Sequence, residues 1–221
     1  PNKSESKRKK IFKKNIMLSG HILTDTGISW FWSDERIKKN IKYEIIGLDK
    51  LLAEQSAEKG VLLFFKHSLH LELDSRIIGM HAKIYGVERK HNSEYFQSIQ
   101  NQGRLKSMVD VVDRKNTIRF MKWLKGGKTV LYAPDQDYGM NKSRRVNFFK
   151  NPAATVSAPY KIIQRTKCKT YFLNSYIKEN KLYLDIEELN FNDIDELNFL
   201  EDLNKFIENK IKLNPQEYLW Q

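Results

Sequence analysis

Two short runs rich in apolar residues constrain the fold of this chain more than any other feature. Residues 61–65 read Val-Leu-Leu-Phe-Phe and residues 128–133 read Lys-Thr-Val-Leu-Tyr-Ala. Runs of this length with little alternation are typical of strands that helices cover on both faces. Polar residues follow both runs, and open α/β sheets bind ligands at the carboxyl ends of their strands. We therefore expect one sheet that carries a polar site at the ends of these two strands.

The rest of the chain alternates between strand and helix signals. This alternation predicts an α/β fold with a mixed, mostly parallel central sheet flanked by helices and preceded by an N-terminal helical segment. The stretch 134–150 is predicted to be a loop because it is polar and contains Gly, Asn and Arg. Strands are expected at 43–46, 61–65, 81–85, 128–133, 169–176 and 181–186, and helices at 48–58, 68–79, 93–102, 114–124, 153–165 and 195–213.

We expect a single domain with two parts. The chain has 221 residues, of which 40% are hydrophobic, enough for one sizeable core. Residues 1–42 form the N-terminal basic helical segment, with an approximate apolar stripe that ends at Trp30-Phe-Trp32. Large rings at this place can mark a bilayer interface or a helix end packed on the core. The residues alone favour packing on the core, and the family resemblance given below favours a membrane-proximal segment. Residues 43–221 form the α/β domain.

The charge of the chain favours acidic partners. The formal net charge is +12 and the sequence pI is about 9.6, which suits an acidic protein, an anionic lipid surface or nucleic acid. The single cysteine, Cys168, excludes an intramolecular disulfide and a cysteine-based zinc site, and we interpret it as a small buried hydrophobe. No run reaches the ~18 apolar residues of a membrane-spanning helix. Because the chain starts at Pro1, we expect it to be a fragment.

The strongest candidate for chemistry is His67, which lies just after the first apolar run and Lys66, with Glu72 after four intervening residues. A carboxylate on one imidazole nitrogen fixes the tautomer and raises the basicity of the other nitrogen. The pair can thus take a proton from an alcohol that attacks a carbonyl group. Three alternatives remain open: a metal site formed by His67, His70, Glu72 and Asp74, His70 as the base, and a purely structural His67.

A second polar constellation follows the other apolar run. Asp135-Gln-Asp-Tyr-Gly139 can bind a metal, position a substrate or form a structural turn. The basic residues Lys142, Arg144 and Arg145 come next and are typical of an anion clamp, because the arginine fork matches phosphate geometry. Together with Val146–Phe149, this stretch suits an amphiphilic substrate with phosphates and acyl chains better than a nucleic acid.

Taken together, the motifs resemble those of the late acyltransferases of lipid A biosynthesis, in particular the lauroyltransferase-like branch. The resemblance runs over nearly the whole chain and rests on the order and spacing of the motifs. They are Asp25-Thr-Gly-Ile-Ser-Trp-Phe-Trp32, His67-x4-Glu72, Glu88-Arg-Lys-His-Asn92, Gly103-Arg-Leu105, Asp113-Arg-Lys115, Tyr132-Ala-Pro-Asp-Gln-Asp-Tyr-Gly139, Phe148-Phe149 followed by Ala153-Ala-Thr155, and Asn214-Pro-Gln-Glu-Tyr-Leu-Trp220.

The resemblance implies an O-acyltransferase that moves a fatty acyl group from acyl carrier protein onto a hydroxyl of a lipid A precursor, at the cytoplasmic face of the inner membrane. It implies His67 as general base and Glu72 as its orienting partner, with no cofactor and no metal. It also implies an anchor helix, which we expect to lie outside this chain. The expected substrate-binding residues are Arg89, Arg104, Asp135, Asp137, Arg144 and Arg145.

The alternative is a binding module without catalysis that recognises nucleic acid or another anionic surface. It rests on the net charge and on the basic start of the chain. The aromatic residues are not interleaved with the basic ones, as a base-stacking platform would require. We therefore expect no nucleic-acid partner. Besides acyl carrier protein and the lipid A precursor, we expect the protein to bind an anionic membrane surface.

Overall fold

The computed structural model describes residues 4–137, 139–191 and 195–220, so Lys3 of the basic start and Tyr138 of the second polar constellation lie outside the described residues. A central seven-stranded sheet has the order β1-β9-β8-β2-β5-β3-β4. Every neighbouring pair is parallel except β8 and β9, which form an antiparallel hairpin. The predicted α/β class with a mixed, mostly parallel sheet is confirmed. The strands are β1 (Tyr43–Ile46), β2 (Val61–Phe65), β3 (Ile84–Glu88), β4 (Met108–Asp113), β5 (Thr129–Tyr132), β8 (Lys169–Lys178) and β9 (Lys181–Leu189).

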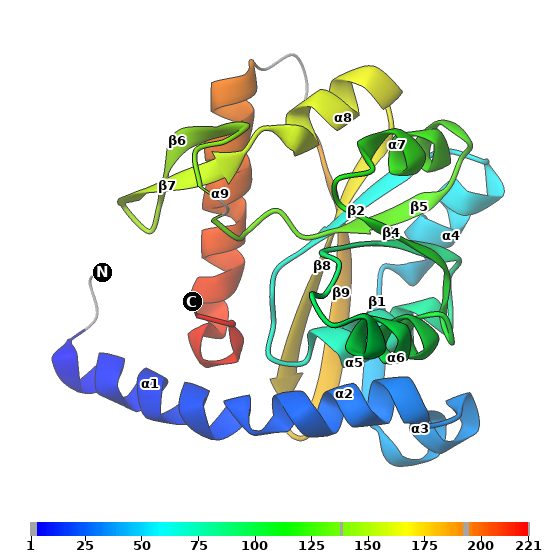
Figure 1. Cartoon of the computed structure of the whole chain (residues 1–221). Coiled ribbons are helices and arrows are strands. Elements are labelled where there is room, and N and C mark those ends of the chain that lie inside the picture. The colour runs from blue at the N-terminus through cyan, green and yellow to red at the C-terminus, as the bar shows by residue number, and fades with distance from the viewer. Residues whose placement is uncertain (1–3, 138, 192–194, 221) are drawn as a thin grey trace.

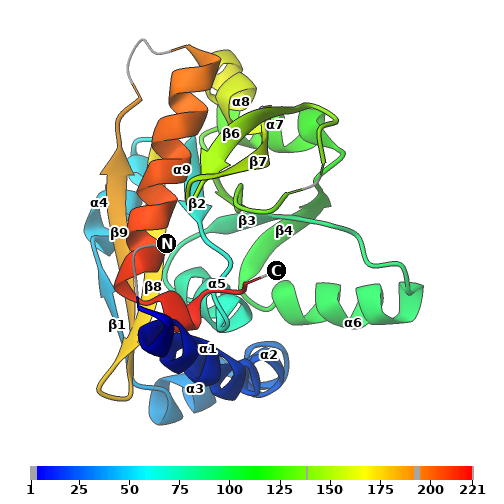
Figure 2. The same cartoon turned by 90° about the vertical axis from the view of Figure 1, so that its left-hand side faces the viewer.

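Helices cover both faces of the sheet (Figures 1 and 2). One core cluster joins α3, α4 and α5 to one face, and a second cluster joins α7, α8 and α9 to the other. Side chains along a strand point alternately to the two faces of a sheet. In β2, Leu63 therefore belongs to the first cluster, whereas Leu62 and Phe64 belong to the second. The helices are α1 (Glu5–Ser19), α2 (His21–Phe31), α3 (Asp34–Asn40), α4 (Leu48–Ser56), α5 (Leu71–Gly79), α6 (Glu94–Arg104), α7 (Thr117–Lys125), α8 (Ala158–Thr166) and α9 (Glu196–Leu213), followed by the short 3-10 helix η1 (Pro215–Glu217).

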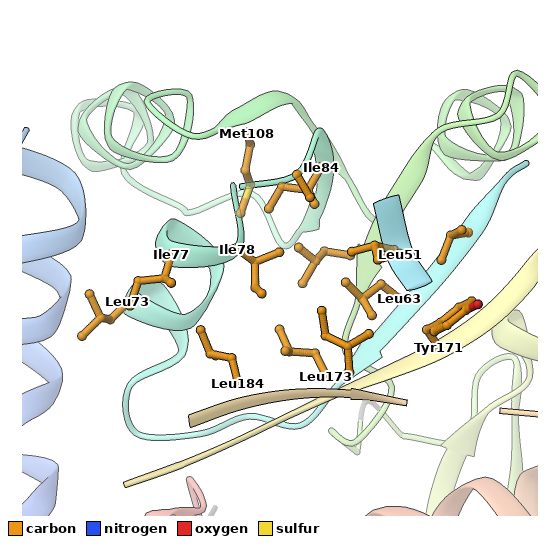
Figure 3. Close-up of a cluster of buried hydrophobic side chains, with 14 of the residues drawn as sticks. Leu51, Leu63, Leu73, Ile77, Ile78, Ile84, Met108, Tyr171, Leu173 and Leu184 are labelled. Atoms are coloured by element: carbon orange, nitrogen blue, oxygen red, sulfur yellow. The ribbon is translucent and has the colours of Figure 1, made fainter. Parts of the chain in front are cut away.

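The first core cluster holds the site-bearing strand β2 against α5. Figure 3 shows Ile77 and Ile78 of α5 together with Leu63 of β2 and Leu173 of β8. Ile77, Ile78 and Leu63 have no exposed surface, and burying each such side chain contributes about 1.5–3 kcal/mol relative to leaving it exposed. The start of α5 is thereby fixed relative to the end of β2.

The N-terminal segment is helical, as predicted, and consists of three helices. α1 and α2 follow one another along one edge of the molecule, with Gly20 between them (Figure 1). Of the three clustered rings only Phe31 is largely exposed, because Trp30 is buried against Phe96 and Trp32 stacks under the Arg36 guanidinium. Within the described residues, no helix combines the length and the apolar character that crossing a bilayer requires.

The structure corrects the sequence-based prediction in residues 134–156 and at one edge of the sheet. The expected loop 134–150 contains β6 (Ser143–Phe148), and the first part of the expected helix 153–165 belongs to β7 (Asn151–Val156), which pairs antiparallel with β6. The turn between them places Phe149 and Lys150 at positive φ, 51° and 68°. Turns with positive φ usually contain Asn-Gly or Asp-Gly. Here the two residues are Phe and Lys, so the sequence does not indicate a turn. The edge strand β4 was also missed.

The close contact of α2 with α6 leads to a stability prediction. A Cβ atom on Gly103 in α6 would overlap the Trp30 side chain, whereas a Cβ on Gly27 in α2 would meet nothing within 4 Å. We expect Gly103→Ala to lower the free energy of unfolding by about 1–3 kcal/mol, as overpacking does. Gly27→Ala should leave it unchanged or raise it by up to about 1 kcal/mol. Urea unfolding of both variants beside the wild type would measure this, and an equally stable Gly103→Ala variant would contradict it.

Candidate active site

The parallel strands bring polar side chains from four places in the sequence to one edge of the sheet. His67 follows β2, Arg89 follows β3, Arg114 follows β4 and Asp135 follows β5. β2 and β5 are neighbours in register, with Phe64 opposite Tyr132, so the loops that leave them start side by side. His67, Arg89 and Arg114 line a cavity of about 250 Å³.

His67 is held by Asp135 at two points. The ring Nδ1 lies 2.6 Å from one carboxylate oxygen, and the backbone N–H of His67 donates to the other oxygen at 2.8 Å. The Asp135 side chain has no exposed surface, and that of His67 is 15% exposed. A fully buried carboxylate with two donors is fixed in orientation. Nδ1 therefore serves as the donor to Asp135, and Nε2 remains available as a base.

The carboxylate that contacts the His67 ring is thus Asp135, whereas Glu72 was expected to be its partner. Glu72 also lines the cavity, but its carboxylate accepts from Trp30 Nε1 at 2.8 Å and from Arg104 Nε at 3.2 Å. The expectation used sequence proximity along α5. The parallel pairing of β2 with β5 brings Asp135 nearer to the ring, from 68 residues away.

Arg104 is clamped between two carboxylates and forms part of the cavity wall. Its guanidinium forms ion pairs with Glu72 and with Glu88 at the end of β3. Burial lowers the pKa of Arg104, and the attraction of both carboxylates outweighs this effect, so the net shift is upward. Gln97 and Gln100 of α6 donate to the Glu88 carboxylate at 2.5 Å and 2.9 Å. Arg104 is therefore at the site, as expected, in a fixed position.

Of the four remaining expected binding residues, one lies at the cavity and the other three lie outside its lining. Arg89 borders the cavity, as described above. Asp137 has a structural contact, because it accepts from the backbone N–H of Gly139 at 2.7 Å and of Ala154 at 3.0 Å. These backbone donors, Ala154 foremost, lower the pKa of Asp137. Arg144 and Arg145 lie on β6 with exposed side chains, outside the cavity lining, and Arg144 pairs with Glu196 at 3.2 Å.

His70 faces a different environment from His67. It is 3% exposed, and its Nδ1 lies 3.0 Å from Asp74 and its Nε2 3.4 Å from Glu217. Asp74 in turn accepts from the hydroxyls of Ser68 and Ser175 at 2.7 Å and 2.6 Å. In the described parts of the chain, no three His, Cys, Asp or Glu side chains converge as metal ligands. The four residues of the alternative metal site do not converge on one point, because His67 contacts Asp135, Glu72 contacts Arg104, and His70 and Asp74 contact each other.

Sequence reasoning missed two groups near the site. The ammonium of Lys66, next to His67, is buried and donates to the backbone carbonyl of Ser175 at 2.8 Å. The end of the chain, Glu217–Leu219, runs beside residues 67–69. Lys66 was missed because a lysine normally indicates an exposed position. The Asn214–Trp220 motif gave no indication that its residues contact a loop about 150 positions earlier.

The arrangement defines a class of protein. An imidazole with a buried carboxylate partner can act as a general base without a serine or cysteine nucleophile. Apolar side chains, among them Phe65, Met108 and Leu131, supply much of the cavity wall, and arginines lie at the strand ends. Such an arrangement suits general-base chemistry on a substrate that is apolar in one part and anionic in another.

Comparisons with known proteins identify the family. The model for the bacterial lipid A biosynthesis acyltransferase family matches residues 1–221. The chain is 33% identical to the lipid A biosynthesis lauroyltransferase of Escherichia coli (strain K12), over 100% of the chain and 73% of that protein. It is 30% identical to the lipid A biosynthesis palmitoleoyltransferase of the same strain, over 100% and 72%, and 34% identical to a lipid A biosynthesis acyltransferase of Haemophilus influenzae, over 100% and 71%. The chain belongs to the bacterial lipid A biosynthesis acyltransferase family.

Among solved structures, the 1-acyl-sn-glycerophosphate acyltransferase PlsC of Thermotoga maritima matches 91% of this chain and 98% of its own. The TM-score is 0.45 at 12% sequence identity, a likeness too distant to carry an argument about the site.

The His70–Asp74 pair leads to a prediction on pH. Burial lowers the pKa of His70, but the attraction and hydrogen bond of Asp74 outweigh it and raise the pKa above its ordinary 6.5. Burial raises the pKa of Asp74, but His70, Ser175 and Ser68 outweigh it and lower the pKa below 3.8. The histidine contribution to stability is complete below pH 6.5 and is lost as pH rises through the folded-state pKa. The aspartate contribution is present above pH 3.8 and is lost as pH falls below it.

The pair should therefore stabilise the fold most between pH 3.8 and 6.5. Urea unfolding at pH 5.5 and 8.5 measures the difference. We expect a loss of stability at the higher pH that shrinks in His70→Gln and persists in His91→Gln, since His91 is exposed. An unchanged pH dependence in a folded His70→Gln variant would contradict this assignment.

Proposed function

We propose that this chain transfers a fatty acyl group from acyl carrier protein to a hydroxyl of a lipid A precursor, with His67 as general base and Asp135 as its orienting partner. The supporting observation is the 2.6 Å contact between His67 Nδ1 and the buried Asp135 carboxylate, at the border of a cavity with apolar and arginine-bearing walls. Membership of the family supplies the reaction class.

In the proposed reaction, Asp135 holds the proton on Nδ1 and leaves Nε2 as acceptor. Nε2 takes the proton of the acceptor hydroxyl as its oxygen attacks the thioester carbonyl. The tetrahedral intermediate collapses, the carbon–sulfur bond breaks, and the thiolate leaves with the proton from the imidazolium. The products are an ester and the free thiol of the carrier. The oxyanion needs a donor, for which an arginine or a backbone N–H is suited.

Glu72 has a different proposed role from the one that sequence proximity indicated. Its carboxylate fixes Arg104, and Trp30 Nε1 fixes the carboxylate. Loss of Glu72 would leave Arg104 with only Glu88 as a charged partner. We propose that Glu72 and Arg104 shape the cavity in which the acyl group lies, while the proton transfer belongs to His67 and Asp135.

The charge of the protein supports both proposed substrates. A carrier protein rich in acidic residues and a precursor that carries phosphates would each be attracted to a chain of net charge +12. Arg89 at the cavity and the exposed Arg144 and Arg145 on β6 are the proposed phosphate or carrier contacts. Phe12 and Met17 are largely exposed on α1, which also carries Lys9, Lys10, Lys13 and Lys14, and Leu23 of α2 is largely exposed as well. These exposed apolar side chains and the basic helix favour contact of this edge with an anionic membrane surface at the cytoplasmic face.

The test supplies acyl-loaded carrier protein and a tetra-acylated lipid A precursor in liposomes and determines the lipid mass. The wild type should add one acyl chain. His67→Ala and Asp135→Asn should each lower kcat by about 10²–10⁴-fold, the usual contribution of general-base catalysis. Glu72→Gln should reduce activity by a smaller factor, because it weakens one contact of Arg104 and leaves the base intact.

The matched control is Asp113→Asn, since Asp113 also stands at the carboxyl end of a strand. Its carboxylate accepts from the backbone N–H groups of Lys90 and Lys115 at 3.0 Å and 2.7 Å, and it does not line the cavity. We expect acyl transfer close to the wild-type level. Full activity of a folded Asp135→Asn variant beside an inactive Glu72→Gln variant would reverse the assignment of the two carboxylates.

A further inference from the structure

The last residues of the chain pair with the loop that carries His67. Ser68 and Tyr218 form an antiparallel bridge. On either side of it, Leu69 N–H donates to the Glu217 carbonyl and Leu219 N–H donates to the His67 carbonyl, both at 2.9 Å. The loop between β2 and α5 is thus bonded along one side to a segment about 150 positions later in the sequence.

Tyr218 reaches the other member of the pair. Its side chain is buried, with a relative exposure of 5%, and its hydroxyl donates to the backbone carbonyl of Asp135 at 3.3 Å. Burial raises the pKa of Tyr218, so the hydroxyl stays protonated as a donor. Two consecutive residues therefore donate to the two loops: Tyr218 to the Asp135 carbonyl and Leu219 to the His67 carbonyl.

Residues 216–218 are in turn held by hydrogen bonds to β8 and α1. The Glu217 carboxylate accepts from the backbone N–H of Ile177 on β8 at 2.9 Å. Asn15 of α1 donates to the carbonyls of Gln216 and Tyr218, each at 2.9 Å. Figures 1 and 2 show this end of the chain close to α1. The contacts on both sides make it a rigid support for the loop.

We propose that Glu217–Leu219 is a positioning element for the His67–Asp135 pair, with Tyr218 as a positioning residue that acts through Asp135. The proposal rests on the proposed function. Two loops with no regular structure of their own carry the pair, and catalytic groups must be held within about 0.5 Å of the productive geometry. One support that bonds both loops meets that requirement, because a displacement of about 1 Å can cost about 10²-fold in rate.

The first variants remove one bond each. Tyr218→Phe deletes the hydroxyl and keeps the ring. Leu219→Pro deletes the N–H that donates to His67, and Tyr218 already has the extended backbone that precedes proline (φ −86°, ψ 140°). We expect kcat to fall about 5–10-fold in each, with KM and the melting temperature close to wild type, since one hydrogen bond is lost in each case. Leu219→Ala, which keeps the N–H, should lose less activity than Leu219→Pro. Trp220→Phe loses the bond to the Pro215 carbonyl but keeps an aromatic ring beside Tyr218 and Phe149, and it should keep full activity.

A double-mutant cycle separates positioning from general stability. If Tyr218 acts through Asp135, Tyr218→Phe should reduce kcat in the wild type and have little further effect in Asp135→Asn. An equal reduction in both backgrounds would overturn the proposal, as would wild-type kcat in folded Tyr218→Phe and Leu219→Pro variants.

A second readout does not depend on acyl transfer. In protein labelled with ¹⁵N-histidine, the ring N–H signal that disappears in His67→Ala reports the bond to Asp135. We expect this signal to shift in Tyr218→Phe and to stay in place in Trp220→Phe. An unmoved signal in Tyr218→Phe would overturn the positioning role even if the wild type transfers no acyl group. A shifted signal with an inactive wild type would retain the positioning role and reject the proposed reaction.

Discussion

The parallel pairing of β2 with β5 is the interaction on which the candidate site depends. Leu62, Leu63 and Phe64 are fully buried, and apolar clusters on both faces hold the pair in a single register. A slip of one residue would turn these side chains to the opposite faces, so the core specifies the register strongly. The same register sets how far apart the two following loops begin. The distance between an imidazole and its carboxylate is in this way a consequence of hydrophobic packing below them.

The sequence indicated the fold class and the place of the site because both depend on short apolar runs. Residues 61–65 and 128–133 were expected to be core strands, and they correspond to β2 and β5. His67 was expected at the end of the first strand for the same reason. The hydrophobic periodicity of a sequence does not indicate which strands are neighbours in the sheet. Glu72 was near in sequence, but strand order brings Asp135 to the ring.

Other departures have the same physical origin. The β6–β7 hairpin turns at Phe149 and Lys150, which adopt positive φ without the glycine that a turn normally shows. The bridge between Ser68 and Tyr218 joins distant positions and has no local pattern. The Lys66 side chain is buried because it meets a backbone carbonyl on β8. Each case is a tertiary contact that overrides the local preference of the residues, and single-sequence reasoning has no access to it.

The clamp on Arg104 has a consequence for what enters the cavity. The guanidinium of Arg104 lies between the carboxylates of Glu72 and Glu88 and forms an ion pair with each. Because its N–H groups already donate to these carboxylates, the Arg104 guanidinium is poorly placed to bind a phosphate. An anionic headgroup is better placed beside Arg89, where a positive charge borders the same cavity. Arginines that line one cavity therefore differ in what they can bind, according to the partners that the fold has already given them.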